Sequence, residues 1–306
     1  MSDSQQFTEP LPLNYSLAER KLCILTFWLL VLFDSVVLPI GLYYLLTRLT
    51  TWSKTTIFSV LTLTLFGTFV TESLQRSWYL WRKGSTCRLS NAGRYDFDFA
   101  QWNILVAWVI IIAELGIGTI PEPPIMRMLA MPVPSIFFIF ALEMLVFEVL
   151  YVLKKPAPFR ISSIPKGDPM RPAIYPLLED IVAVDGKGGT EFRTRLDQRY
   201  KTSPPFREML HRVTMLWAVP QVVVAGGTLA GIVIADSELA YTLGWSVPAI
   251  WAGIWVLLTV ICVRLDLRRE RHYWRRVRFT QQLQEEETLV VIDGEAVDTA
   301  EDEDAK

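Results

Sequence analysis

Long apolar stretches alternate with charged ones along this sequence. A helix needs about 20 mostly apolar residues to cross the hydrocarbon core of a bilayer, which is about 30 Å thick. Six stretches approach or exceed this length, namely Leu22–Leu46, Thr55–Thr71, Phe99–Thr119, Met131–Leu153, Val213–Ala235 and Tyr241–Val263. The pattern predicts an all-α fold, a six-helix transmembrane bundle with a small helical cytosolic cap.

The composition favours a membrane protein over a soluble one. Hydrophobic residues make up 51% of the 306 residues, and charged residues make up 20%. Soluble proteins carry about 25% charged residues. Membrane lipids are therefore the expected surroundings. The formal net charge of −2 says little about partners, and no nucleic-acid partner is expected.

Basic residues divide unequally between the two sides that six spans create. An even number of spans places both termini on one side, and segments rich in Lys and Arg stay in the cytosol. With the N-terminus inside, all but Arg48, Lys54 and Arg127 of the 30 Lys and Arg residues are cytosolic. We therefore expect both termini in the cytosol of a membrane that the sequence does not identify. The glycosylation sequon at Asn14 then stays unmodified.

The predicted spans divide the chain into five parts. The parts are a cytosolic tail (1–21), helices one to four with a basic cytosolic loop (22–153, loop 72–98), a cytosolic helical loop (154–212), helices five and six (213–263), and a basic juxtamembrane segment followed by an acidic disordered tail (264–306).

The cytosolic loop 154–212 is Pro-rich at first and then has the pattern of short helices. We expect helices over Pro176–Val184 and Glu191–Tyr200, the second capped by Thr190, and a helix that starts at Ser203 and continues into the fifth span. Acids and arginines alternate here, which suits either a folded, salt-bridged cap or a solvated surface. These residues are Glu179, Asp180, Asp185, Glu191, Arg171, Arg193, Arg195 and Arg199. This loop is the expected docking site for a protein partner.

Four carboxylates fall inside the predicted spans, where no Lys, Arg or His accompanies them: Asp34, Glu114, Glu143 and Glu148. Ionisable groups are costly in lipid and usually face the bundle interior. Asp34 and Glu143 lie near the middle of their spans, so they could meet at the midplane. The four acids are candidates for a proton-transfer or cation-binding centre, with hydrogen-bonded packing groups as the alternative.

Two further features suggest contacts with lipid or with a neighbouring helix. The juxtamembrane arginines are expected to touch anionic headgroups, and they are Arg268, Arg269, Arg271, Arg275, Arg276 and Arg278. Gly227 and Gly231 form a GxxxG element, which is expected to let two helices pack closely.

Several well-known chemistries lack their residues in this sequence. With only two His and three scattered Cys, no disulfide framework, no zinc site and no other metal site is expected. The sequence also lacks the G-x-S-x-G nucleophile motif and the Walker phosphate-binding motif. No cofactor is expected.

Two groups of residues carry a resemblance to known sequences. The first group runs from Arg171-Pro172-Ala173-Ile174-Tyr175 through Leu178-Glu179-Asp180-Ile181-Val182-Ala183-Val184-Asp185-Gly186 to Ser203-Pro204-Pro205-Phe206-Arg207, and the second is Arg82-Lys83-Gly84-Ser85-Thr86-Cys87 with Arg94-Tyr95-Asp96-Phe97-Asp98. Together they resemble a family of uncharacterised multi-pass membrane proteins of filamentous fungi. The resemblance implies a multi-pass topology and a fungal origin, and it implies no chemistry.

Three functions remain open on the sequence. The first is a membrane-embedded accessory or interaction protein whose cytosolic loops dock partners. The second is an integral-membrane enzyme acting on a lipid or terpenoid, with Asp34 or Glu143 as general acid. The third is a small proton-coupled carrier that uses the same acids. An enzyme or carrier needs these acids in one cavity, whereas an interaction protein leaves them scattered.

Overall fold

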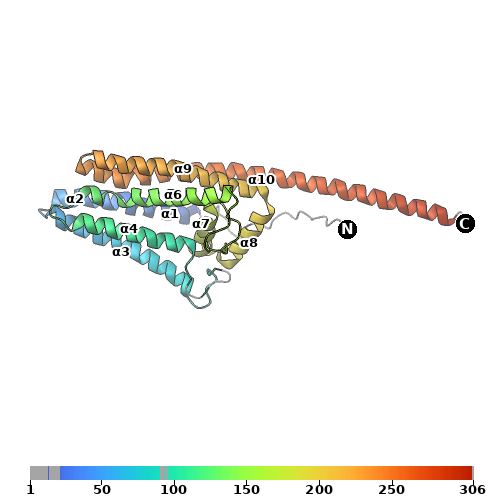
Figure 1. Ribbon diagram of the computed structural model, residues 1–306, viewed down its shortest axis with the longest axis horizontal. Helices are drawn as coiled ribbons and strands as arrows, with labels where there is room; N and C mark the ends of the chain where they lie inside the picture. The colour runs from blue at the N-terminus through green and yellow to red at the C-terminus, as the bar shows by residue number, and fades with distance from the viewer. Residues whose placement is uncertain (1–12, 14–20, 90–92, 94–95, 305–306) are drawn as a thin grey trace.

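The computed structural model describes residues 13, 21–89, 93 and 96–304 (Figure 1). The chain is 79% helical, and the described part contains no strands, which confirms the all-α prediction. The sequon at Asn14 and most of the predicted N-terminal tail lie outside the described residues.

A single helical rod extends from Lys21 to Leu49 and covers the first predicted span. It consists of α1 (Lys21–Leu32), a π-helical stretch η1 (Phe33–Gly41) and α2 (Leu42–Leu49). Pro39 lies inside η1 and has no N–H to donate, so the wider π turns accommodate it without ending the helix.

Five more long helices follow: α3 (Lys54–Trp81), α4 (Phe99–Thr119), α6 (Pro132–Val152), α9 (Pro204–Ile234) and α10 (Ser237–Asp304). Four of the described helices are long and apolar enough to cross a membrane, namely α4, α6, α9 and the Ser237–Gln284 part of α10. In α3, the apolar stretch found among the described residues is Lys54–Gly67, which is shorter than these spans. The structure thus indicates an integral membrane protein with four spans that meet these criteria.

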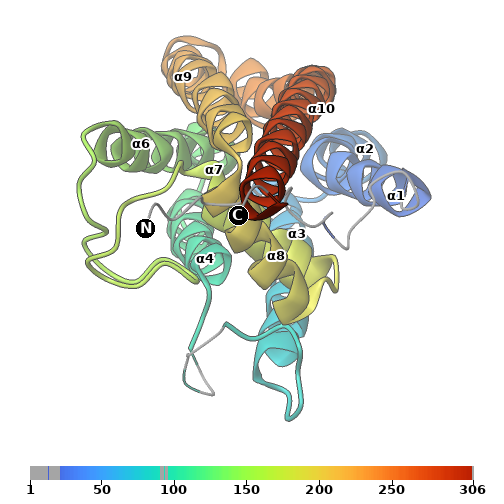
Figure 2. The same cartoon turned by 90° about the vertical axis from the view of Figure 1, so that its right-hand side faces the viewer.

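The six rods form a closed ring (Figure 2). Going round it, α3 contacts α4, α4 contacts α6, α6 contacts α9 and α9 contacts α10. The first rod closes the ring because η1 packs on α10 and α2 packs on α3. At one end of the ring, the short helix α5 (Met126–Leu129) contacts both α4 and α10. Gly244 of α10 is needed there, since a Cβ at this position would lie 1.9 Å from the carbonyl oxygen of Ala130.

The opposite end of the ring carries the α7–α8 segment, which we define as residues 153–203. It contains α7 (Ile174–Asp180), η2 (Ile181–Asp185) and α8 (Gly189–Thr202). The segment shares one hydrophobic core with α6 and α9, in which Tyr175, Phe192 and Leu196 are fully buried. The predicted short helices are therefore confirmed, although α8 begins at Gly189, so Thr190 lies within it and does not cap it.

Helix α9 begins as predicted, because the Ser203 hydroxyl accepts a hydrogen bond from the backbone N–H of Phe206 at 3.4 Å. Helix α10 differs from the prediction at its far end. It continues to Asp304 as one long rod that projects past the α7–α8 segment, where the composition predicts a disordered acidic tail (Figure 1). Extending an existing helix needs no new nucleus, so an acidic segment rich in Glu can follow it.

Candidate functional site at the α7–α8 end of the bundle

The guanidinium of Arg76 clamps α3 to the start of α4. Its two terminal nitrogens donate to both carboxylate oxygens of Asp98, at 2.8 and 2.9 Å. Asp98 also caps α4, because it accepts the backbone N–H of Gln101 at 2.8 Å. The Arg76 and Asp98 side chains are 6% and 0% exposed. A bidentate pair of this kind is geometrically specific, so it fixes how the two helices meet.

A second buried arginine, Arg193, joins α8 to α7 and to this clamp. One of its terminal nitrogens donates to Glu179 at 2.6 Å and to Asp180 at 2.7 Å. The other lies 3.7 Å from Asp98. All four side chains are at most 2% exposed. The prediction of a folded, salt-bridged segment is therefore confirmed, and the solvated alternative is wrong for these residues.

Asp180 ties the α6–α7 link into the same cluster. Its carboxylate accepts the backbone N–H of Ala100 at 3.1 Å and a hydrogen bond from the hydroxyl of Ser162. That hydroxyl in turn accepts the backbone N–H of Phe99 at 3.0 Å. The first turn of α4 is thus hydrogen-bonded to the segment that lies over it.

The cluster contains more acids than bases. Four carboxylates (Asp98, Glu179, Asp180 and Asp185) surround two guanidiniums (Arg76 and Arg193). Burial raises the pKa of Asp180, and the nearby charge of Asp98 raises it further, while Arg193 acts in the opposite direction. The cluster therefore favours holding a proton on Asp180. We call these six residues the charge cluster.

Two further contacts lie outside the charge cluster, one within the α7–α8 segment and one that joins the segment to α10. Arg171 lies between the rings of Tyr175 and Tyr200, 4.5 and 4.8 Å from their centroids, and donates to Asp197 at 2.6 Å. Glu270 of α10 accepts from the Ser203 hydroxyl at 2.8 Å, next to the start of α9. The long helix α10 is therefore fastened to the α7–α8 segment before it projects beyond it.

The four predicted intramembrane acids do not come together. Glu148 of α6 pairs with His211 of α9, and it also accepts the backbone N–H of Ala173 at 3.3 Å. The expectation that all four acids lack a basic partner is thus wrong for Glu148. The reason is that α9 starts well before its apolar part, so its first turns bring His211 alongside the end of α6.

Glu114 and Asp34 also lie apart from each other. Glu114 accepts a hydrogen bond from Ser135 at 2.7 Å, which links α4 to α6 as the packing alternative predicts. Asp34 belongs to η1, which packs on α10, α2, α1 and α3. The structure therefore assigns the two acids to different interfaces.

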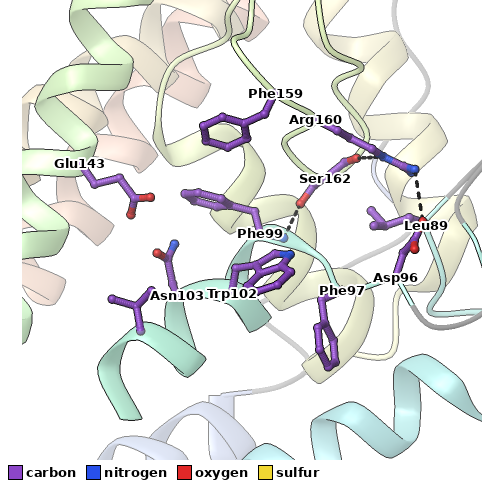
Figure 3. A pocket seen from close by; sticks show the side chains of 11 residues that line it. Leu89, Asp96, Phe97, Phe99, Trp102, Asn103, Glu143, Phe159, Arg160 and Ser162 are labelled. Carbon is purple, nitrogen blue, oxygen red and sulfur yellow. Dashed lines mark hydrogen bonds and ion pairs between the residues drawn. The ribbon is translucent and has the colours of Figure 1, made fainter. Parts of the chain in front are cut away.

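Glu143 lines a cavity of about 470 Å³ between α4, α6 and the two links that lie over them (Figure 3). Asn103, four residues after the start of α4, also lines it and lies near Glu143. Four residues correspond to about 6 Å of helix. Glu143 thus lies level with the second turn of α4, toward the α7–α8 end of the bundle. Asp34 is not among the described residues that line this cavity, and its helix η1 packs mainly on α10, α2, α1 and α3, so the structure does not bring these two acids together.

The GxxxG element does not mark a close helix contact. A Cβ at Gly227 or Gly231 would meet no described heavy atom within 4 Å. Helix α9 buries a different face, which includes Ala225, Thr228 and Ile232. The packing role predicted for these two glycines is therefore wrong within this chain.

The six predicted lipid-contact arginines are all exposed on α10. Because α10 continues as a straight rod along the bundle, Arg278 lies about 15 Å further out than Arg268. Their contact with headgroups stays a prediction.

The arrangement of the charge cluster points to a structural role. Each carboxylate of the cluster is within ion-pair distance of a guanidinium. Within the described part of the chain, no group of three or more His, Cys, Asp or Glu is placed to hold a metal ion. What the cluster does is hold helices from four parts of the sequence in one fixed arrangement.

Comparison with known proteins places the chain in a family. No curated protein and no solved structure matches it. A family model described as a domain of unknown function, DUF8766, matches residues 1–274, which include the ring, the charge cluster and the cavity. This chain therefore belongs to the DUF8766 family, an uncharacterised family.

Proposed function

We propose that this protein spans the membrane six times, with both termini and the α7–α8 segment in the cytosol, and acts as an accessory or interaction protein. The observation that carries the proposal is the charge cluster. It holds the α7–α8 segment on the ends of α3 and α4 through buried ion pairs of Arg76 and Arg193. A segment held in this way presents a preformed surface, which lowers the entropic cost of binding a partner.

The closed ring supports six spans. The first rod and α3 complete a ring whose other four members are long and apolar enough to cross a bilayer. The distribution of Lys and Arg supports the orientation, since the α7–α8 segment lies at the end of the bundle that carries most of them. The fungal origin remains an expectation from the resemblance.

The scattered acids favour this function over the enzyme and carrier alternatives. Glu148 is paired with His211, and Glu114 is hydrogen-bonded to Ser135. Glu143 is the one of the four acids that lines the described cavities. A proton relay or an acid–base pair would need at least two of these groups within reach of one substrate.

Site-specific photocrosslinking in cells tests the proposal. A photoreactive residue is placed at Lys166 or Thr194, which are exposed on the α7–α8 segment, or at Thr51, which is exposed in the turn at the opposite end. We expect the first two positions to give the same discrete protein adduct, and Thr51 to give none.

Arg193→Met serves as a second arm, because it disturbs the cluster while it leaves the exposed surface unchanged. We expect this substitution to weaken the adduct at both positions. Adducts to lipid alone at Lys166 and Thr194, or an adduct of equal yield at Thr51, would contradict a docking role for this segment.

A further inference from the structure

The cavity beside Glu143 has the size and position of a small-molecule site. Its volume of about 470 Å³ lies within the roughly 300–1,000 Å³ that such sites occupy. One face of α4 forms its floor, with Phe99, Trp102, Asn103 and Val106 at helical spacing. The α6–α7 link covers it with Phe159.

The polar groups of the cavity lie at two ends with different charge balance (Figure 3). At one end Arg160 is 3.7 Å from Asp96, so these two charges offset each other. At the other end the carboxylate of Glu143 points into the space beside Asn103 and Phe99. Among the described residues, no Lys, Arg or His is paired with Glu143, and Asn103 is neutral. The described lining therefore leaves one carboxylate without a counter-cation.

Aromatic rings surround the space between these two ends. Phe97, Phe99, Trp102 and Phe159 all line it. The faces of such rings attract cations, Trp most strongly. A carboxylate combined with several rings is a suitable lining for an organic ammonium group, since the rings also exclude water from around it.

The cavity also opens toward the apolar surface of the bundle. Trp102 and Val106 are 58% and 44% exposed, and both lie on a helix apolar enough to cross a membrane. An apolar chain attached to a group in the cavity can pass over Val106 and continue along α4 into lipid. This geometry suits an amphiphile better than a water-soluble amine.

We propose that this cavity binds the primary ammonium group of an amphiphile, with Glu143 as its counter-charge and Trp102 against it, while the apolar chain leaves over Val106. Two sources carry this chemistry, a single-chain amine and the ethanolamine headgroup of a phospholipid. The cavity borders the charge cluster at Ser162 but is lined by none of its six residues, and the proposal does not depend on the docking function.

Native mass spectrometry of the full-length protein in detergent tests the site. Three probes are titrated: hexadecylamine, hexadecanol as a chain of equal length without charge, and a phosphatidylethanolamine. We expect hexadecylamine, phosphatidylethanolamine or both to bind as one equivalent, at least about tenfold more tightly than hexadecanol, because hydrogen bonds to charged groups are worth more than neutral ones. Whichever of the two amines binds more tightly identifies the source of the ammonium group.

Three variants locate the site. Glu143→Gln keeps the shape of the side chain but removes its charge, and we expect it to weaken binding at least about tenfold. Trp102→Leu, at an exposed position, is expected to weaken it about two- to fivefold. Glu114→Gln makes the same chemical change outside the described lining and should leave binding unchanged.

Several results would overturn the proposal. They are equal affinity for hexadecanol and hexadecylamine, no saturable binding of either amine, and an equal effect of Glu143→Gln and Glu114→Gln. Loss of the photocrosslinked protein adduct alone would not affect the proposal, so failure of the docking function and failure of this site remain distinguishable.

Discussion

Replacing Arg193 with methionine removes the guanidinium from the centre of the charge cluster and leaves similar side-chain volume. Glu179, Asp180 and Asp98 would then remain buried with only Arg76 as a counter-charge. Removing one partner of a buried ion pair costs about 3–5 kcal/mol, because the remaining charge is left without compensation. We expect the α7–α8 segment of this variant to open far more often than that of the wild type.

Cys87 provides the assay. Its side chain is buried against Leu80 and Val184, and its carbonyl oxygen accepts from Arg193 at 3.5 Å. A thiol reagent reaches it only when the segment opens, so the labelling rate follows the open population. A loss of about 3–5 kcal/mol raises this rate about 10²- to 5 × 10³-fold. Cys23 and Cys262 are replaced by serine beforehand to give a single reporter.

Arg195 provides a matched control two residues away on α8. It pairs with Glu191 at 2.5 Å, but both side chains are partly exposed, at 30% and 61%. Exposed pairs at this spacing are worth about 0.3–0.5 kcal/mol, so Arg195→Met should raise labelling only about twofold. Adding Glu179→Gln and Asp180→Asn to Arg193→Met should slow labelling again. A rise below about tenfold for Arg193→Met, or equal rises for both arginine variants, would refute the reasoning.

Three other predictions follow from single features. Burial and the charge of Asp98 raise the pKa of Asp180 from 3.8 to about 7, so the folded protein binds more protons than the unfolded one between these pH values. The melting temperature should therefore fall as pH rises through this window, and it should fall less for Asp180→Asn. Gly244→Ala should destabilise the fold by about 1–3 kcal/mol, because the new Cβ meets the Ala130 carbonyl. Gly227→Ala places a Cβ where no described atom lies within 4 Å, so it should stabilise the fold by up to about 1 kcal/mol. An equal shift in melting temperature for both variants would contradict the close contact between Gly244 and Ala130. The sequon at Asn14 should remain unglycosylated in a secretory-pathway membrane, and a glycosidase-sensitive gel shift would place the N-terminus outside.

The local pattern was enough to predict individual helices. Helix α4 begins and ends where its apolar stretch does, at Phe99 and Thr119, because Asp98 supplies a cap and the stretch ends near a Pro-rich link. The start of α9 could likewise be predicted from Ser203 and Pro204. These signals depend on residues close in sequence, so one sequence suffices to find them.

The contacts between helices could not be predicted in this way. Arg76 and Asp98 are separated by 22 residues and Glu148 and His211 by 63, and only the packing of the ring brings each pair together. Sequence reasoning counted Arg76 as one of many cytosolic basic residues. The one available signal was Asp98 directly before the apolar stretch, typical of a capping residue, which needs a partner when buried.

The depth of Glu143 was missed for a related reason. Its place near the middle of α6 predicts the midplane only if neighbouring helices start at the same level. In the structure α6 extends further toward the α7–α8 segment than α4 does, so Glu143 lies beside Asn103 in the second turn of α4. The offset between two helices is a tertiary property that hydropathy does not contain.

Side-specific labelling of two cysteines tests the central claim most directly, since a docking platform has to face the cytosol. Lys166→Cys lies on the exposed surface of the α7–α8 segment, and Thr51→Cys lies in the turn at the opposite end. In intact cells or sealed vesicles of known orientation, treated with a membrane-impermeant thiol reagent, we predict labelling of Thr51→Cys from the outside. Lys166→Cys should react only after the membrane is permeabilised. Labelling of both positions from one side, or the reverse pattern, would contradict the proposed topology and the docking function that depends on it.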